Sequence, residues 1–259
     1  MPDRIRLDGK VAVVTGAAGV IGTATIQLLA ARGSRIVAVD RREQDLKTAI
    51  KDLPDSAQAV AITADVTRED EVAEYVRAAV DEFGTIDVFD NNAGIEGEII
   101  SMTKYPVETF RKVIDVNVVG VFLGLKHVLP VMLKQKSGSI INTASIAGLI
   151  GSPDVAVYSA SKHAVIGLTK SAALECAGTG VRVNCVCPGL IDSRMLSAII
   201  EGRNPGNAPV PNEKIVERIP ARRLGQASEV ASVVAFLASD DASYVSGSAY
   251  TVDGGRVAS

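Results

Sequence analysis

The sequence lacks a strong charge bias and lacks the long apolar segments of a membrane protein. Its 259 residues carry 27 Lys and Arg against 30 Asp and Glu, and no basic stripe stands out. We therefore expect neither a nucleic-acid partner nor binding to a membrane surface. No uninterrupted apolar run reaches the roughly 18 residues of a membrane helix. The polar start, MPDRIRLDGK, has no signal-peptide character, so we expect a cytoplasmic protein.

Cysteine and histidine are scarce. The three cysteines, Cys176, Cys185 and Cys187, fit a reducing compartment. Two of them alternate along the apolar stretch VRVNCVCPG, so both point to one face of a strand. Neither His127 nor His163 has a ligand-like spacing to these cysteines. We therefore predict small buried side chains here and no metal site.

Short apolar runs alternate with helical stretches along the whole chain, with no repeat and no low-complexity tract. Helical periodicity is clear over 69–84 and 163–178, and both stretches end at glycine. The pattern predicts a single α/β domain over 1–259, a doubly wound Rossmann-type fold with helices on both faces of a seven-stranded, mostly parallel sheet. The seven predicted strands are VAVVTG, RIVAVD, AVAIT, IDVFDNNAG, SGSIINTAS, VRVNCVCPG and SAYTVDGG.

One irregular stretch, 201–214, is rich in Pro, Gly and Asn. A long loop in a compact enzyme is typical of a lid or binding loop, so we predict a substrate lid over about 193–220. A tolerated surface insertion is the alternative.

The first predicted strand leads into three glycines with the spacing Gly16-x-x-Gly19-x-x-Gly22. Gly16 allows a tight turn off the strand, and Gly22 allows the following helix to pack close to the sheet. The first N–H groups of that helix are suited to bind a pyrophosphate. Val20 stands where short dehydrogenases commonly have a second glycine, and we expect its backbone amide still to face the phosphates.

The second predicted strand ends in Asp40. A carboxylate at this distance from the glycines binds the ribose hydroxyls of NAD and repels the 2'-phosphate of NADP. Arg41 and Arg42 follow directly, and an arginine there accommodates that phosphate. The residues favour NAD as the cofactor, with NADP the less favoured alternative.

Tyr158 and Lys162 are four residues apart in a helical stretch, so both side chains lie on one helix face. A free tyrosine has a pKa of about 10, and a nearby ammonium group favours the phenolate. We therefore expect Lys162 to lower the pKa of Tyr158. Ser145 follows a predicted strand, where the open end of a parallel sheet binds ligands, and its hydroxyl is suited to bind a substrate oxygen.

Together these motifs resemble the short-chain dehydrogenase/reductase family, in its short branch, over nearly the whole chain. The serine and the tyrosine stand thirteen positions apart, as is usual in that family. Within that family, the chain resembles the NAD-dependent secondary-alcohol and cyclic-ketone dehydrogenases. The matching segments are TGAAGVIG, ADV, NNAG, DVNVVGVF, TAS, YSASK, PGLIDS and DGG.

The resemblance implies a catalytic set of four residues. Tyr158 would be the general acid-base, and Lys162 would lower its pKa and hold the nicotinamide ribose. Ser145 would orient the substrate, and Asn117 would support a water that leads protons to solvent. The resemblance also implies cofactor contacts by Gly16, Gly19, Val20, Ile21, Gly22, Asp40, Arg41, Asp65, Val66, Asn91, Ala93, Gly94, Tyr158, Lys162, Pro188, Ile191 and Ser193.

Three positions depart from the family. Ser193 replaces a common threonine and keeps the hydroxyl, whereas Arg194 stands where proline is common and faces either substrate or solvent. Asp90 stands where an apolar residue is usual, and a buried carboxylate there would need partners. The glycine spacing is shared with longer sugar-nucleotide enzymes of the family, but NNAG and the short stretch after DGG favour the short branch.

The predicted lid mixes apolar residues with charges, which favours an apolar, uncharged alcohol or ketone as the small-molecule substrate. An NADP-dependent 3-oxoacyl-carrier-protein reductase and a hydroxysteroid dehydrogenase are the enzymatic alternatives. A cofactor-sensing protein without turnover is the alternative of another class, which the complete Ser-Tyr-Lys set disfavours. The resemblance also implies a homotetramer built on the Tyr158 helix and on the C-terminal helix and strand.

Overall fold

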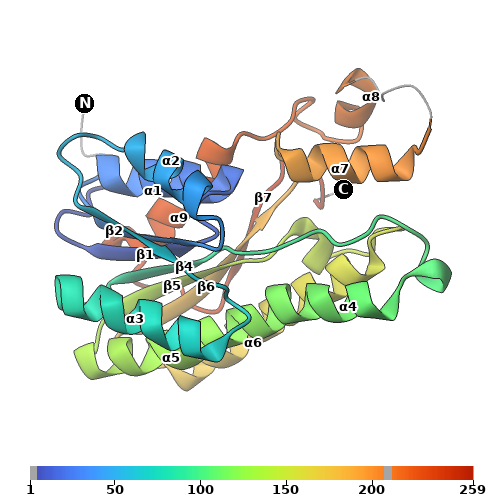
Figure 1. The fold of residues 1–259 in the computed structure, drawn as a ribbon. Helices are drawn as coiled ribbons and strands as arrows, with labels where there is room; N and C mark the ends of the chain where they lie inside the picture. Colours follow the sequence, from blue (N-terminus) through green and yellow to red (C-terminus); the bar gives the residue numbers. More distant parts are fainter. Residues whose placement is uncertain (1–4, 207–211, 259) are drawn as a thin grey trace.

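A seven-stranded parallel sheet forms the centre of the protein (Figure 1). The computed structural model describes residues 5–206 and 212–258. The strand order is β3-β2-β1-β4-β5-β6-β7, and all six neighbouring pairs are parallel. The predicted fold class is therefore confirmed. The strands are β1 Val11–Thr15, β2 Arg35–Asp40, β3 Ala59–Thr63, β4 Val88–Asn91, β5 Gly138–Thr143, β6 Val181–Pro188 and β7 Ala249–Val252.

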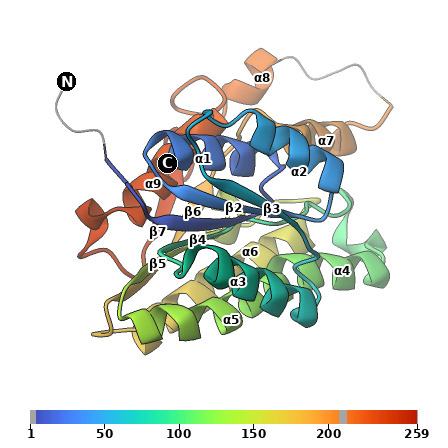
Figure 2. The ribbon, with the colours of Figure 1, turned by 60° about the vertical axis from the view of Figure 1, so that its left-hand side comes forward.

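Helices cover both faces of the sheet, so the central strands read as continuous apolar runs (Figures 1 and 2). Helices α1, α2 and α9 pack on one face, and α3, α5 and α6 pack on the other. The helices are α1 Val20–Ala31, α2 Glu43–Lys51, α3 Glu69–Phe83, α4 Val107–Ile114, α5 Gly120–Gln135, α6 Ala156–Glu175, α7 Arg194–Arg203, α8 Asn212–Val216 and α9 Ala227–Ala238.

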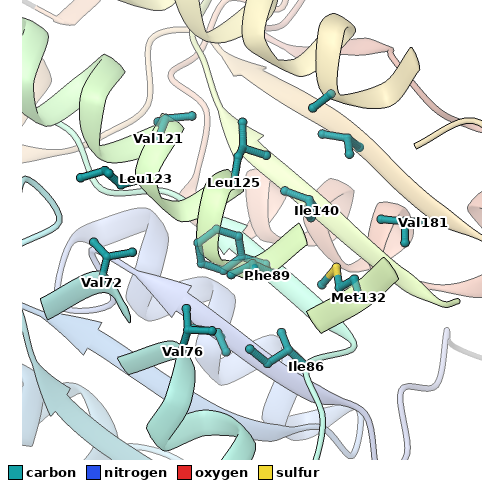
Figure 3. Packing of buried hydrophobic residues seen from close by; sticks show 14 of the residues in the cluster. Val72, Val76, Ile86, Phe89, Val121, Leu123, Leu125, Met132, Ile140 and Val181 are labelled. Carbon is teal, nitrogen blue, oxygen red and sulfur yellow. The ribbon is translucent and has the colours of Figure 1, made fainter. Parts of the chain in front are cut away.

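Each face has its own hydrophobic core because side chains alternate along every strand. In β1, Val11 and Val13 face the α3–α5–α6 layer, whereas Ala12 and Val14 face the α1–α9 layer. Figure 3 shows the first core, in which Phe89 of β4 lies among side chains of α3, α5 and β5. The two cores hold the sheet rigid and thereby fix the loops at its carboxyl edge.

The structure corrects some predicted helix boundaries. Helix α3 ends at the predicted glycine, Gly84, which takes a left-handed φ of 80°. Helix α6 spans Ala156–Glu175 rather than 163–178, so it begins early enough to carry Tyr158. The predicted irregular stretch 201–214 is helical at both ends, in α7 and α8, and its residues 207–211 lie outside the described part.

Helices α4 and α5 join through a π-helical segment, Asp115–Val119, into one run. This run, Val107–Gln135, is long and apolar enough to cross a membrane by length and composition, and its most apolar 18-residue window has a mean hydropathy of 1.8. The sequence analysis, which considered only uninterrupted apolar runs, did not identify this helix. However, 44% of its most apolar window is buried, and the α5 residues pack against the sheet. A core helix of a globular domain passes the same test.

Asp90 is a buried carboxyl group in the middle of the sheet. It lies on β4 between Val14 of β1 and Ile141 of β5, and it is fully buried. Within the described residues, neither carboxylate oxygen has a hydrogen-bond partner, so our expectation of partners was wrong. Instead, burial raises the pKa of Asp90 to about 8, which favours the protonated form at neutral pH.

Candidate active site

A cleft of about 890 Å³ opens at the carboxyl ends of the strands, the edge where doubly wound sheets bind ligands. Most of the predicted site residues line it, although they come from loops that are far apart in the sequence. These residues are Gly16, Gly19, Val20, Ile21, Asp40, Arg41, Asp65, Val66, Ala93, Gly94, Ser145, Tyr158, Lys162, Pro188, Ile191 and Ser193. Gly22, Asn91 and Asn117 lie behind the cleft wall.

A second cavity, of about 750 Å³, lies at the opposite edge of the sheet. It is lined by the first residues of β5 and β6, Gly138 and Val181, and by the C-terminal end of α6. None of the predicted site residues lines it. The carboxyl-edge cleft is therefore the candidate active site.

The glycine loop is too tight for side chains at two of its positions. Gly16 has a φ of 64°, and a Cβ on it would lie 2.9 Å from Ala93 Cα. A Cβ on Gly22 would lie 2.2 Å from the Gly16 carbonyl oxygen. Helix α1 starts at Val20 with no side-chain cap on its N-terminus. The arrangement leaves helix N–H groups facing the cleft, as pyrophosphate binding requires.

Asp40, at the end of β2, bonds to the backbone of the glycine loop and of the turn into α2. Its Oδ2 accepts a hydrogen bond from the Ala18 amide at 3.1 Å, and its Oδ1 accepts one from the Arg42 amide at 3.1 Å. The Arg42 side chain pairs with Asp45 at 2.9 Å. The carboxylate is therefore fixed at the cleft wall, where it is suited to accept hydrogen bonds from ribose hydroxyls.

Asp65 and Val66 form the adjoining wall after β3. Asp65 Oδ1 accepts hydrogen bonds from the Thr67 amide and hydroxyl at 2.9 and 2.8 Å. Its own amide donates to Glu71 at 2.7 Å. These bonds fix the turn into α3. A Cβ on Gly120 would lie 2.9 Å from Val66 Cγ2, so α5 packs directly behind this wall.

The sequence analysis did not single out Thr15, at the end of β1, or Asn92, directly after β4. The Thr15 hydroxyl accepts hydrogen bonds from the amides of Asn92 and Ala93 at 3.0 and 3.2 Å, and Asn92 Nδ2 donates to the Thr15 carbonyl at 3.0 Å. These bonds tie the two cofactor loops together. Asn91 points away from the cleft and donates to the Val121 carbonyl at 3.0 Å. Thr15 is the first residue of the TGAAGVIG segment that matches the family, so the sequence did offer a reason to single it out.

Tyr158 and Lys162 share one face of α6, next to Ser145 at the end of β5. Burial raises the pKa of Tyr158 to about 12, while a hydrogen bond with Ser145 opposes this rise. Burial also lowers the pKa of Lys162 to about 8. The Lys162 Nζ atom lies 5.6 Å from the Tyr158 ring centroid and donates to the Thr143 carbonyl at 2.7 Å. The prediction that the pKa of Tyr158 is lowered is therefore wrong for this structure, because burial raises it.

Asn117 lies on the π-helical segment, fully buried behind the catalytic face. Its Oδ1 accepts from the Ile95 amide at 2.8 Å, and its Nδ2 donates to the Ile95 carbonyl and to Ser161 Oγ at 2.9 and 3.0 Å. A Cβ on Gly94 would lie 3.3 Å from both Asn117 Oδ1 and Lys162 Nζ. Asn117 thus holds the segment after β4 beside Lys162, and π-helical turns often occur at such functional sites.

The stretch predicted to be a lid begins at Ser193, whose hydroxyl caps α7 by accepting from the Leu196 amide at 3.2 Å. Arg194 forms two hydrogen bonds to Glu96, at 2.7 and 3.2 Å, across the cleft. At the other end of α7, Arg203 donates to Ser152 Oγ at 2.8 Å and to the Pro153 carbonyl at 2.9 Å. Helix α7 is therefore fastened at both ends.

Within 5–206 and 212–258, no group of three or more His, Cys, Asp or Glu side chains is arranged to hold a metal. Cys185 and Cys187 are both fully buried in the α6-facing core. Tyr158, Lys162 and Ser145 line the cleft together with Gly16 and Gly19 of the glycine loop.

Comparisons with known proteins agree with this geometry. The family described as Enoyl-(Acyl carrier protein) reductase matches residues 16–256. Levodione reductase of Leifsonia aquatica is 40% identical over 98% of this chain and 96% of its own. Cyclohexanol dehydrogenase of an Acinetobacter species is 41% identical, over 96% and 95%. A 3-oxoacyl-[acyl-carrier-protein] reductase of Thermotoga maritima is 40% identical, over 98% and 100%.

Solved structures give the same result. The crystal structure of levodione reductase superimposes with a TM-score of 0.95 at 39% identity, covering 98% of this chain and 100% of that one. The structure of NAD+-bound xylitol dehydrogenase has a TM-score of 0.93 at 38% identity, covering 96% and 99%. At these identities and coverages the likeness extends to the whole architecture.

Proposed function

Because this chain belongs to the short-chain dehydrogenase/reductase family, we propose that it transfers a hydride between NAD(H) and an apolar or cyclic secondary alcohol or its ketone. The observation that carries the proposal is the meeting of Ser145, Tyr158 and Lys162 in one cleft with the glycine cradle. The family establishes an NAD(P)-dependent oxidoreductase acting on CH–OH groups. The choice of NAD and the class of alcohol are our proposals.

Each of these residues has its own role in the proposed reaction. The bound nicotinamide supplies hydride transfer. The Tyr158 phenol gives its proton to the carbonyl oxygen in reduction and takes the hydroxyl proton in oxidation. The Ser145 hydroxyl, beside Tyr158, is placed to hydrogen-bond the same oxygen and stabilise charge that develops on it. Because the pKa of Tyr158 is raised, alcohol oxidation should increase with pH as the phenolate forms.

Asp40 supports NAD as the cofactor. Its carboxylate is held by two backbone amides at the cleft wall, where it would repel a 2'-phosphate. We expect Asp40→Ala to lower the ratio of kcat/KM for NAD+ over NADP+ by about tenfold or more. Asp55→Ala is the matched control, because Asp55 is exposed and lies outside the cleft lining. An unchanged ratio in Asp40→Ala would contradict the ribose role.

The lid supports an uncharged substrate. Four arginines in or just after the lid bond within the chain: Arg194 to Glu96, Arg203 to Ser152 and Pro153, Arg222 to the Glu217 carbonyl, and Arg223 to Glu229. Arg218 of the lid also lines the cleft. An acyl-carrier-protein reductase would use such residues for an acidic partner. The Thermotoga maritima relative keeps that activity as the second candidate, together with a hydroxysteroid dehydrogenase. A non-catalytic sensor would have no need of the complete Ser-Tyr-Lys set.

The test is nicotinamide absorbance with NAD+ or NADP+ over a panel of cyclic and linear secondary alcohols, a hydroxysteroid and a 3-hydroxyacyl thioester. We expect turnover of a secondary alcohol with NAD+. Tyr158→Phe should remove this turnover while NADH binding persists, since the general acid-base contributes about 10²- to 10⁴-fold. Turnover of the thioester alone with NADP+ would favour the reductase. Full activity in Tyr158→Phe would overturn the assignment.

We also propose a cytoplasmic homotetramer. Exposed apolar side chains on the outer helices support association: Leu174 near the end of α6 is 78% exposed, and Tyr244 before β7 is fully exposed. Phe110 and Phe122 of the α4–α5 run are also exposed. The buried free cysteines are compatible with a reducing compartment. Light scattering on the eluted protein should give four times the chain mass, and a monomer would contradict the proposal.

A further inference from the structure

Glu96 and Arg194 form an ion pair across the mouth of the substrate end of the cleft. They are 98 residues apart in the sequence, on the segment after β4 and on the first turn of α7. The pair is bidentate, with nitrogen–oxygen distances of 2.7 and 3.2 Å. Such parallel bonds fix the relative orientation of the two groups as well as their distance.

The two partners differ in exposure. The Glu96 side chain is 11% exposed, whereas the Arg194 side chain is 73% exposed. The carboxylate therefore lies inside the cleft and the guanidinium covers it from the solvent side. A mostly buried carboxylate is costly unless it is paired, and Arg194 supplies that pairing for Glu96.

Glu96 also acts on Tyr158, since its negative charge contributes to the raised pKa of that phenol. Other groups bear on Tyr158 as well: Lys162 from α6, Ser145 after β5 and Cys187 from β6. The remaining charged groups that line the cleft are Asp40, Arg41, Arg42, Asp65, Glu98, Lys112, Arg203, Arg218 and Arg256. Within the described residues, the Glu96–Arg194 pair is the one ion pair that joins α7 to the segment after β4.

We propose that Arg194 is a positioning residue that neutralises Glu96 beside Tyr158 while fastening the start of α7 over the cleft. The proposal rests on the proposed function in one respect, namely that Tyr158 is the acid-base group. It goes beyond that function because it assigns the tuning of Tyr158 to a lid residue that touches neither the tyrosine nor the reacting atoms.

Removing Glu96 and removing Arg194 should shift the pKa of Tyr158 in opposite directions. Without Arg194, the charge of Glu96 acts on Tyr158 uncompensated, so the phenolate is disfavoured. Without Glu96, the remaining guanidinium favours the phenolate. Removal of both charges should restore nearly the original balance. For a unit charge across a partly solvated cleft, each single change should amount to roughly half to one pH unit.

The experiment is an ultraviolet titration of the Tyr158 phenolate in Arg194→Met, Glu96→Gln and the double variant. Each protein is compared with the same protein carrying Tyr158→Phe, so the difference reports Tyr158 without any substrate, and circular dichroism checks folding. We expect a midpoint above that of the parent chain in Arg194→Met, below it in Glu96→Gln, and near it in the double variant. Arg77→Met, which breaks an exposed ion pair with Glu74 on α3, is the matched control and should leave the midpoint unchanged.

The pH dependence of cyclohexanol oxidation with NAD+ is the second readout, and its rising limb should move in the same directions. If all midpoints and limbs coincide with those of the parent chain, the pair only fastens the lid and the proposal is overturned. If Tyr158→Phe retains turnover, the proposed function fails instead, whereas the titration still decides the electrostatic assignment. The two failures are therefore distinguishable.

Discussion

Replacing Asp90 should change how the stability of the protein depends on pH. The carboxyl group is fully buried, and its pKa rises from 3.8 to about 8 because burial penalises the charged form. A group whose folded pKa is raised stabilises the fold fully below its unfolded pKa and loses this contribution as pH rises through its folded pKa. The slope is about 1.4 kcal/mol per pH unit. From about pH 5 to about pH 8 the protein should therefore lose roughly 4 kcal/mol at this residue.

Asp90→Asn removes the titration and keeps the shape of the side chain. Its amide adds an unpartnered buried donor, a penalty of about 1–3 kcal/mol that is independent of pH. Urea unfolding of the parent chain and the variant should show the free-energy difference shifting in favour of the variant as pH rises. Asp55→Asn, at an exposed position, is the control. A difference that stays constant between about pH 5 and pH 8 would refute the reasoning.

Two further predictions concern the cradle and the lid. Gly22→Ala should weaken NADH binding by more than about tenfold in a fluorescence titration, because the new Cβ would lie 2.2 Å from the Gly16 carbonyl oxygen. Gly167→Ala, where nothing lies within 4 Å, should bind normally, and equal affinity in both variants would contradict the steric argument. Arg203→Met should raise the KM for the alcohol by about tenfold with NADH affinity retained, because α7 loses its bonds to Ser152 and Pro153. An unchanged KM would contradict the prediction that the Arg203 bonds to Ser152 and Pro153 position α7 for substrate binding.

The parts of the fold that could be predicted from sequence are those that local patterns determine. The strands are apolar runs because both faces of a parallel sheet are buried, and the sequence shows those runs directly. Gly16 and Gly22 stand at positions where the structure leaves no space for a Cβ. Tyr158 and Lys162 share a helix face because of their spacing alone. Each of these inferences needs only residues close together in the chain.

The features that were missed depend on pairs distant in sequence. The hydrogen bonds between Thr15 and Asn92 join residues 77 positions apart, and the Glu96–Arg194 pair joins residues 98 positions apart. Periodicity carries no information about such pairs, because each partner alone reads as an ordinary loop residue. Helix α6 starts two residues before Tyr158, which the sequence analysis had already placed in a helical stretch. The apolar residues at 155–157 lack a clear helical period, so the first residue of the helix could not be predicted.

The Tyr158 site shows the limit of inference from proximity. The four-residue spacing correctly predicts that the ammonium and the phenol are neighbours, and attraction between them favours the phenolate. Burial acts on both groups in the opposite sense, since it raises the pKa of Tyr158 and lowers that of Lys162. The sign of the net effect therefore depends on how completely the surrounding loops exclude water and on which other charges they bring in. The segment after β4 brings in the charge of Glu96, and burial gives the largest effect, so the acid-base behaviour of Tyr158 is a property of the whole cleft rather than of the Tyr-x-x-x-Lys motif alone.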